Sequence, residues 1–115
     1  MLKSLRNSSR GLWRILTERM FLIELSFGVA IVSLTWIWGD FTLFDRLVVL
    51  TFVFLVLCFE GINTALEKLL DFISPEYRKE VGVIKDMLAG VVLIGIIGAF
   101  VVGIVVLLRV IDIIP

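Results

Sequence analysis

Three polar residues share one side of a segment that is otherwise almost entirely apolar. Glu60, Asn63 and Glu67 follow a run of thirteen uncharged residues, 47–59. On an α-helix, intervals of three and four residues place these side chains on one face, together with Thr64 and Asp71. A charged side chain in hydrocarbon costs about 3 kcal/mol or more, so this face must meet protein, water or a ligand. The chemistry of the protein is therefore predicted to take place there.

The composition is that of a membrane protein. Hydrophobic residues make up 60% of the 115-residue chain, and its mean hydropathy is +1.11. A soluble domain of this length cannot bury so much apolar surface in one core. The net charge of zero argues against nucleic-acid binding. The absence of histidine excludes a histidine base and most zinc sites, and the single Cys58 excludes an intrachain disulfide.

Three segments are long and apolar enough to cross a bilayer, namely residues 20–38, 43–67 and 87–108. Residues 1–17 alternate leucines and Trp13 with basic residues, which predicts an amphipathic helix at the membrane interface. In the intervening 68–86 loop, Ser74 and Pro75 predict the start of a short surface helix that ends near Gly82. We therefore expect an all-α membrane protein with one domain over residues 1–115.

The basic residues predict the orientation of these spans. Nine of the eleven Lys and Arg residues lie before the first span or between the second and third. Such an excess is typical of cytoplasmic segments. The N-terminus and the 68–86 loop are therefore predicted to be cytoplasmic, whereas the turn near Asp40 faces outward.

Six carboxylate or amide side chains gather near the same cytoplasmic boundary: Glu18, Glu24, Glu60, Asn63, Glu67 and Asp86. Carboxylates without histidine or a cysteine cluster suit a hard cation such as Mg²⁺, which usually arrives with a nucleotide. Lys85 is expected beside the N-terminus of the third span, where backbone N–H groups favour anions. With Glu60 as a candidate general base, this combination fits phosphoryl transfer to a lipid hydroxyl.

The same residues also allow other interpretations. Intramembrane ionisable groups form proton relays and ion pathways, so Glu24, Glu60 and Asn63 could instead line a small oligomeric channel or a proton-coupled transporter. Asp86 could simply cap the third helix. A stripe of small residues favours close helix packing and could belong to a non-catalytic assembly subunit; it consists of Gly95, Ala99 and Gly103.

One motif resembles a known family. The segment Glu60-Gly-Ile-Asn63-Thr-Ala-Leu-Glu67, with Asp71 four residues later, resembles the E-x-x-N-[ST]-A-[IL]-E-x-x-x-D signature of the prokaryotic diacylglycerol kinase and undecaprenol kinase family. Residues 85–87 resemble the Lys-Asp pair at the head of that family's third helix. Residues 17–21 resemble the acidic motif before its first span. The resemblance covers about residues 10–108.

The resemblance implies a small lipid kinase of the bacterial inner membrane. It implies a homotrimer with active sites between subunits, and phosphorylation of diacylglycerol or undecaprenol by ATP with Mg²⁺. Glu60 would then be the general base. The remaining positions carried over are the metal ligands Glu18 and Glu67, the nucleotide contacts Glu18, Asn63, Glu67, Lys85 and Asp86, and the lipid or auxiliary residues Glu24 and Asp71.

Overall fold

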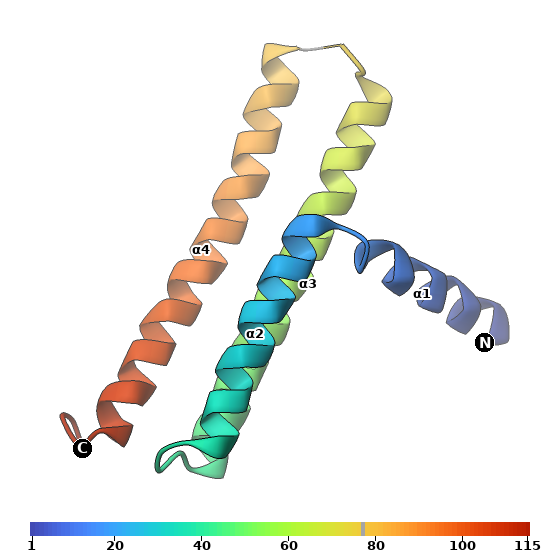
Figure 1. Cartoon of the computed structure of the whole chain (residues 1–115). Coiled ribbons are helices and arrows are strands. Elements are labelled where there is room, and N and C mark those ends of the chain that lie inside the picture. The colour runs from blue at the N-terminus through green and yellow to red at the C-terminus, as the bar shows by residue number, and fades with distance from the viewer. Residues whose placement is uncertain (77) are drawn as a thin grey trace.

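The described part of the chain folds into four helices. A computed structural model describes residues 1–76 and 78–115. Helix α1 spans Leu2–Ile15, α2 Arg19–Ile37, α3 Leu43–Ile73 and α4 Lys79–Val110 (Figure 1). Helices α2, α3 and α4 are each long and apolar enough to cross a membrane. The predicted all-α membrane architecture, with one amphipathic helix before three spans, is therefore confirmed at the level of its helices.

The two long helices extend much further than the predicted spans. Helix α3 continues to Ile73 and α4 begins at Lys79, so most of the predicted 68–86 loop is helical. Ser74 is the C-cap of α3 rather than the N-cap of a short surface helix. Pro75 explains the difference, because a proline disfavours helical backbone at the residue before it and so ends α3. Gly82 lies inside α4, and Tyr77 falls outside the described residues.

The early start of α4 also corrects two expectations about its N-terminus. Lys85 and Asp86 lie nearly two turns inside the helix, whose N-cap is Arg78. Only the first four N–H groups of a helix lack partners within it, so the backbone at these two residues is not free to bind an anion. Asp86 is therefore not a helix cap. Any contact that either residue makes with a ligand must come from its side chain.

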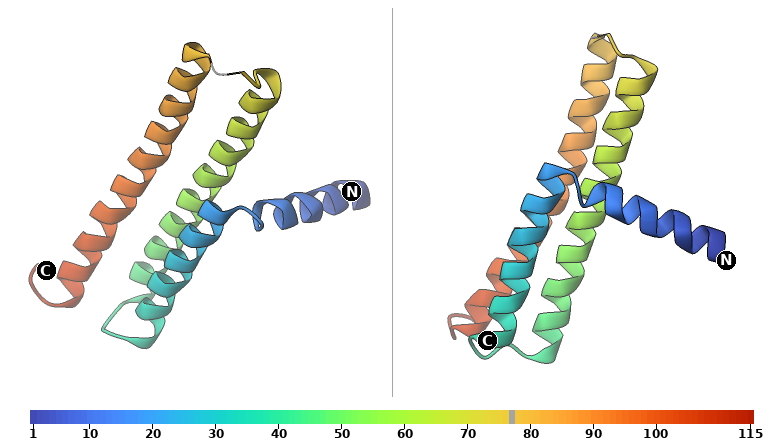
Figure 2. Two further views of the ribbon diagram at one scale, coloured as in Figure 1. Left: turned by 45° about the horizontal axis from the view of Figure 1, so that its top comes forward. Right: turned by 45° about the vertical axis from the view of Figure 1, so that its right-hand side comes forward.

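Helix α3 packs against both α2 and α4 and runs antiparallel to each of them (Figures 1 and 2). The register with α2 places Gly28 against Val53, and the register with α4 places Gly95 against the Phe59 ring. At 1.5 Å per residue, α2 is about 28 Å long and α3 about 46 Å. Helices α3 and α4 therefore project by several turns beyond the start of α2 (Figure 1).

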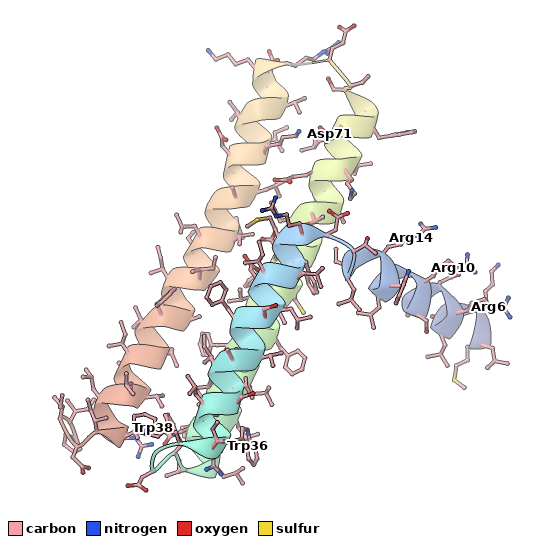
Figure 3. The ribbon with its side chains drawn as sticks, viewed as in Figure 1. Arg6, Arg10, Arg14, Trp36, Trp38 and Asp71 are labelled. Atoms are coloured by element: carbon pink, nitrogen blue, oxygen red, sulfur yellow. The ribbon has the colours of Figure 1, made fainter. Side chains whose placement is uncertain are left out.

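Polar contacts lock the end of the bundle where α2 meets α3. Thr42 and Asp45 form a reciprocal capping box at the start of α3, and buried Asp45 also pairs with Arg109 of α4. Arg46 donates from Nε to the carbonyl of Thr35 at 2.9 Å. Trp36 and Trp38 lie at this end of α2 (Figure 3), a position typical of side chains at a membrane–water boundary. The three long helices are thus tied together at the end opposite the acidic residues.

The small-residue stripe of α4 packs against another helix at one of its two glycines and not at the other. A Cβ atom added at Gly95 would lie 3.0 Å from Cδ2 of Phe59, whereas one added at Gly98 or Gly103 would meet nothing within 4 Å. Close packing across the stripe therefore occurs at Gly95 and not at Gly103 in a single chain.

The tightest helix contact gives a first prediction. A Cβ atom at Gly28 would approach Cγ1 of Val53 to 2.6 Å, so Gly28→Ala should lower the free energy of unfolding by about 1–3 kcal/mol. Gly90→Ala is the matched control, because nothing lies within 4 Å of its added Cβ atom. Denaturant titration in mixed micelles, followed by circular dichroism, measures both. Equal stability of the two variants would contradict the α2–α3 register.

Candidate active site

The predicted polar face lies on α3 where α2 begins and α1 turns away from the bundle (Figure 1). Glu60 is buried, with 8% of its surface exposed, although it carries a carboxylate. The long apolar run before it places Glu60 among the packed helices, and the contact of Gly61 with Phe21 holds the start of α2 beside it. The residue that the sequence singled out is therefore enclosed by its neighbours.

Two helices bring carboxylates together around Glu60. Its carboxylate lies within electrostatic range of Glu24 on α2 and of Glu67 on α3, with the side chain of Thr64 beside it. One carboxylate oxygen of Glu24, Oε2, is buried and has no hydrogen-bond partner among the described residues. A polar atom buried in this way is costly unless a ligand or water satisfies it. Glu24 and Glu60 are thus suited to accept a hydrogen bond from a hydroxyl group or to take up a proton.

An amide and a carboxylate lie next along the same face. Asn63 donates from Nδ2 to Oε1 of Glu67 at 3.4 Å, and its own Oδ1 is buried without a partner in the described part of the chain. Oxygen atoms of this kind are the donors that Mg²⁺ prefers. Within residues 1–76 and 78–115 no three acidic side chains lie close enough to hold a metal by themselves. Because Mg²⁺ usually keeps only one or two protein carboxylates, the donors fit an ion that arrives with nucleotide phosphates.

Lys85 reaches this face from α4. Its Nζ lies 2.5 Å from Oδ1 of Asp71, one turn beyond Glu67, and it is also within electrostatic range of Glu67. Figure 3 shows Asp71 near the end of α3 that approaches α4. Tertiary packing therefore brings the Lys85 ammonium group to the acidic face of α3. Asp86 is exposed, and its side chain takes part in none of the side-chain hydrogen bonds or ion pairs of the described residues.

Glu18 pairs with Lys68, a residue that the sequence analysis did not assign to the site. Glu18 is the N-cap of α2, and its carboxylate pairs with Nζ of Lys68 at 2.9 Å. The two residues border a groove of about 420 Å³, together with Arg14 and Thr64. The sequence does contain a signal for this contact. Lys68 directly follows Glu67 and therefore lies at the edge of the polar face of α3.

A second, apolar groove begins at Glu24. It has a volume of about 610 Å³, is lined by α2, α3 and α4, and extends toward Trp38 and Phe41 at the far end of the bundle. Among the described residues that line it, Glu24 alone is charged. The site therefore has a polar side formed by α3 and an apolar side that continues along the spans.

Comparison with known proteins identifies the family. The family model of prokaryotic diacylglycerol kinase matches residues 6–107, which include α2, α3 and most of α1 and α4. Comparison with individual curated proteins gave no match. The matched region contains the Glu60–Asp71 signature, the Lys85-Asp86 pair and Glu18. The chain therefore belongs to the prokaryotic diacylglycerol kinase family, and it is an ATP-using lipid kinase of the membrane.

Proposed function

We propose that this kinase transfers the γ-phosphate of ATP directly to the hydroxyl group of a membrane lipid, with Glu60 as the general base. The supporting observation is a buried carboxylate beside Glu24 and Glu67 at the start of a lipid-sized apolar groove. The lipid hydroxyl gives its proton to Glu60 while its oxygen bonds to the γ-phosphorus. The bond from phosphorus to the bridging oxygen of ADP breaks, and ADP leaves with that electron pair.

The nucleotide is proposed to lie along the rest of the polar face. Asn63, Glu67, Lys85 and Asp86 would contact it, and Glu18 and Glu67 would hold the Mg²⁺ that accompanies the nucleotide. Mg²⁺ would offset phosphate charge during transfer. The unpartnered Oδ1 of Asn63 supports this placement, as does the position of Lys85, which pairs with Asp71 and lies within electrostatic range of Glu67. Asp71 then serves to hold the Lys85 ammonium group near the phosphates.

The lipid is proposed to enter from the apolar side. Its hydroxyl group would meet the unpartnered Oε2 of Glu24, and its hydrocarbon would lie along the groove between α2 and α4. Diacylglycerol and undecaprenol both present a primary hydroxyl at the interface. Transfer of radiolabelled phosphate from ATP to each lipid in nanodiscs is the direct test. Absence of transfer to either lipid, together with ion flux through liposomes lacking ATP, would instead favour a channel.

We also propose that three copies assemble into the active enzyme, with sites between subunits. The open face of α4 at Gly103 supports this assembly, because a neighbouring helix could pack closely there. The many exposed apolar side chains of the single chain provide enough surface for both subunits and lipid.

Losing either proposed metal ligand should change the Mg²⁺ requirement. Glu18→Gln and Glu67→Gln are each expected to raise the Mg²⁺ concentration at half-maximal rate about tenfold or more, because the site has few protein ligands. Activity is titrated against Mg²⁺ at saturating ATP. Lys68→Gln removes the ion pair of Glu18 without removing the carboxylate, and it should leave the midpoint nearly unchanged. An unchanged midpoint in both glutamine variants would contradict the metal assignment.

The orientation of the spans follows from the same mechanism, because ATP is cytoplasmic. Single cysteines are placed at Ser74, in the α3–α4 turn, and at Asp40, in the α2–α3 turn, in a Cys58→Ala background. In intact cells an impermeant maleimide should label position 40 and not position 74. Labelling at position 74 alone would place the polar face outside the cell and remove its access to ATP.

A further inference from the structure

Helix α1 carries four cations on one side and no acidic residue. Lys3, Arg6, Arg10 and Arg14 fall within a sector of about 80° at 100° per residue. Figure 3 shows the three arginines along one side of α1, and all four residues are exposed. These four residues are called the basic stripe. The rest of the site region is acidic, so the chain's net charge of zero conceals a strong local positive charge.

The basic stripe has no ion-pair partner in the part of the chain that the structure describes. None of the ion pairs among residues 1–76 and 78–115 includes it, and α1 contains no buried residue. Helix α1 leaves the bundle at a wide angle and points away from it (Figure 2). Its contact with α3 is near its C-terminal end, where Ile15 lies close to Gly61. The stripe is therefore presented to something outside the chain.

We infer that the basic stripe is a docking surface for anionic phospholipid headgroups of the bilayer that holds the spans. Helix α1 joins α2 through residues 16–18, immediately before the apolar run of α2, so it starts at the membrane boundary. Leu5 and Leu12 are exposed on the opposite side of α1. A membrane interface satisfies both sides, because the leucines can enter hydrocarbon while guanidinium groups pair with lipid phosphates. A soluble acidic partner would leave the leucines in water.

Docking of α1 has a consequence for the site. Arg14 lines the same groove as Glu18, and the hydroxyl of Thr17 donates to the Arg14 carbonyl at 2.6 Å. If docking fixes α1, it also fixes the connection between α1 and α2 that carries Glu18. Because Glu18 is a proposed ligand of Mg·ATP, anionic lipid should then lower the KM for Mg·ATP. This consequence rests on the proposed function, whereas docking itself does not.

Docking can be measured without catalysis. An environment-sensitive dye is attached to Ser8→Cys, on the side of α1 away from the basic stripe, in a Cys58→Ala background. The full chain is reconstituted in phosphatidylcholine vesicles, and in vesicles with one third phosphatidylglycerol. The dye emission should shift to the blue with phosphatidylglycerol, and added salt should reverse the shift. Each basic residue contributes about fivefold, so Arg6→Gln/Arg10→Gln should lower the ratio of docked to free α1 about 25-fold.

Matched variants distinguish the effect of the basic stripe from the effect of the total charge of the chain. Arg78→Gln/Lys79→Gln removes the same charge at the α3–α4 turn and should leave the dye response intact; Arg6→Lys/Arg10→Lys should retain most of it. Equal responses in both vesicle types, or an equal loss in the turn variant, would overturn the inference. So would a loss of phosphoryl transfer in Arg6→Gln/Arg10→Gln with the dye response unchanged. A normal dye response in a chain that transfers no phosphate would refute the proposed function while leaving docking established.

Discussion

Glu60→Gln is expected to lower the rate of phosphoryl transfer about 10²- to 10⁴-fold while leaving the helices folded. The glutamine keeps the shape of the buried side chain but cannot accept the proton of the lipid hydroxyl. It also removes one of the negative charges that Glu24 and Glu67 face, so the fold should not be weakened. Single-turnover transfer from radiolabelled ATP to lipid, at saturating Mg²⁺, measures the chemical step.

The control is Glu80→Gln, which makes the same chemical change on the exposed first turn of α4. It should transfer phosphate at the rate of the unaltered enzyme. Circular dichroism and a denaturant titration establish that both variants are folded. A Glu60→Gln enzyme with activity within a few-fold of the unaltered enzyme would remove Glu60 from the proton transfer and leave Glu24 as the next candidate.

Asp45→Asn should lower the free energy of unfolding by about 3 kcal/mol, although Asp45 lies at the other end of the bundle from Glu60. Asp45 has 3% of its surface exposed and pairs with Arg109, so its loss leaves a positive charge without its partner. The side chain of Arg109 is 37% exposed and can reach water, so the loss should fall at the lower end of the range for buried pairs. Denaturant titration in mixed micelles gives the difference directly.

A second change tests the cause of that loss. Asp45→Asn/Arg109→Gln removes both charges and should recover part of the lost stability, because no charge remains unpaired. Asp112→Asn removes an exposed carboxylate just after the end of α4, at the same end of the bundle, and should have little effect. If the double variant is as unstable as the sum of its single changes, the loss comes from the capping box of Thr42 and Asp45 rather than from the ion pair.

Local sequence patterns were sufficient for the helices but not for their lengths. Hydrophobic runs predicted the three spans because a bilayer requires about 20 apolar residues in each. They could not predict that α3 and α4 continue to Ile73 and from Lys79, since residues beyond the hydrocarbon need not be apolar. Helix length there depends on packing between α3 and α4 and on the break at Pro75. The interpretation of Ser74 as an N-cap failed for this reason.

For the site, the sequence by itself determined the polar face of α3, because Glu60, Asn63 and Glu67 lie on one helix and its periodicity is a local property. Only the tertiary structure decided which residues from other helices meet that face. The register of α2 on α3 places Glu24 beside Glu60, and the register of α4 on α3 brings Lys85 to Asp71. Such registers arise from contacts such as Gly28 with Val53 and Phe59 with Gly95, which join residues far apart in the chain. A list of residue types and spacings does not contain these distances, so the partnership of Lys68 with Glu18 became visible only in the folded chain.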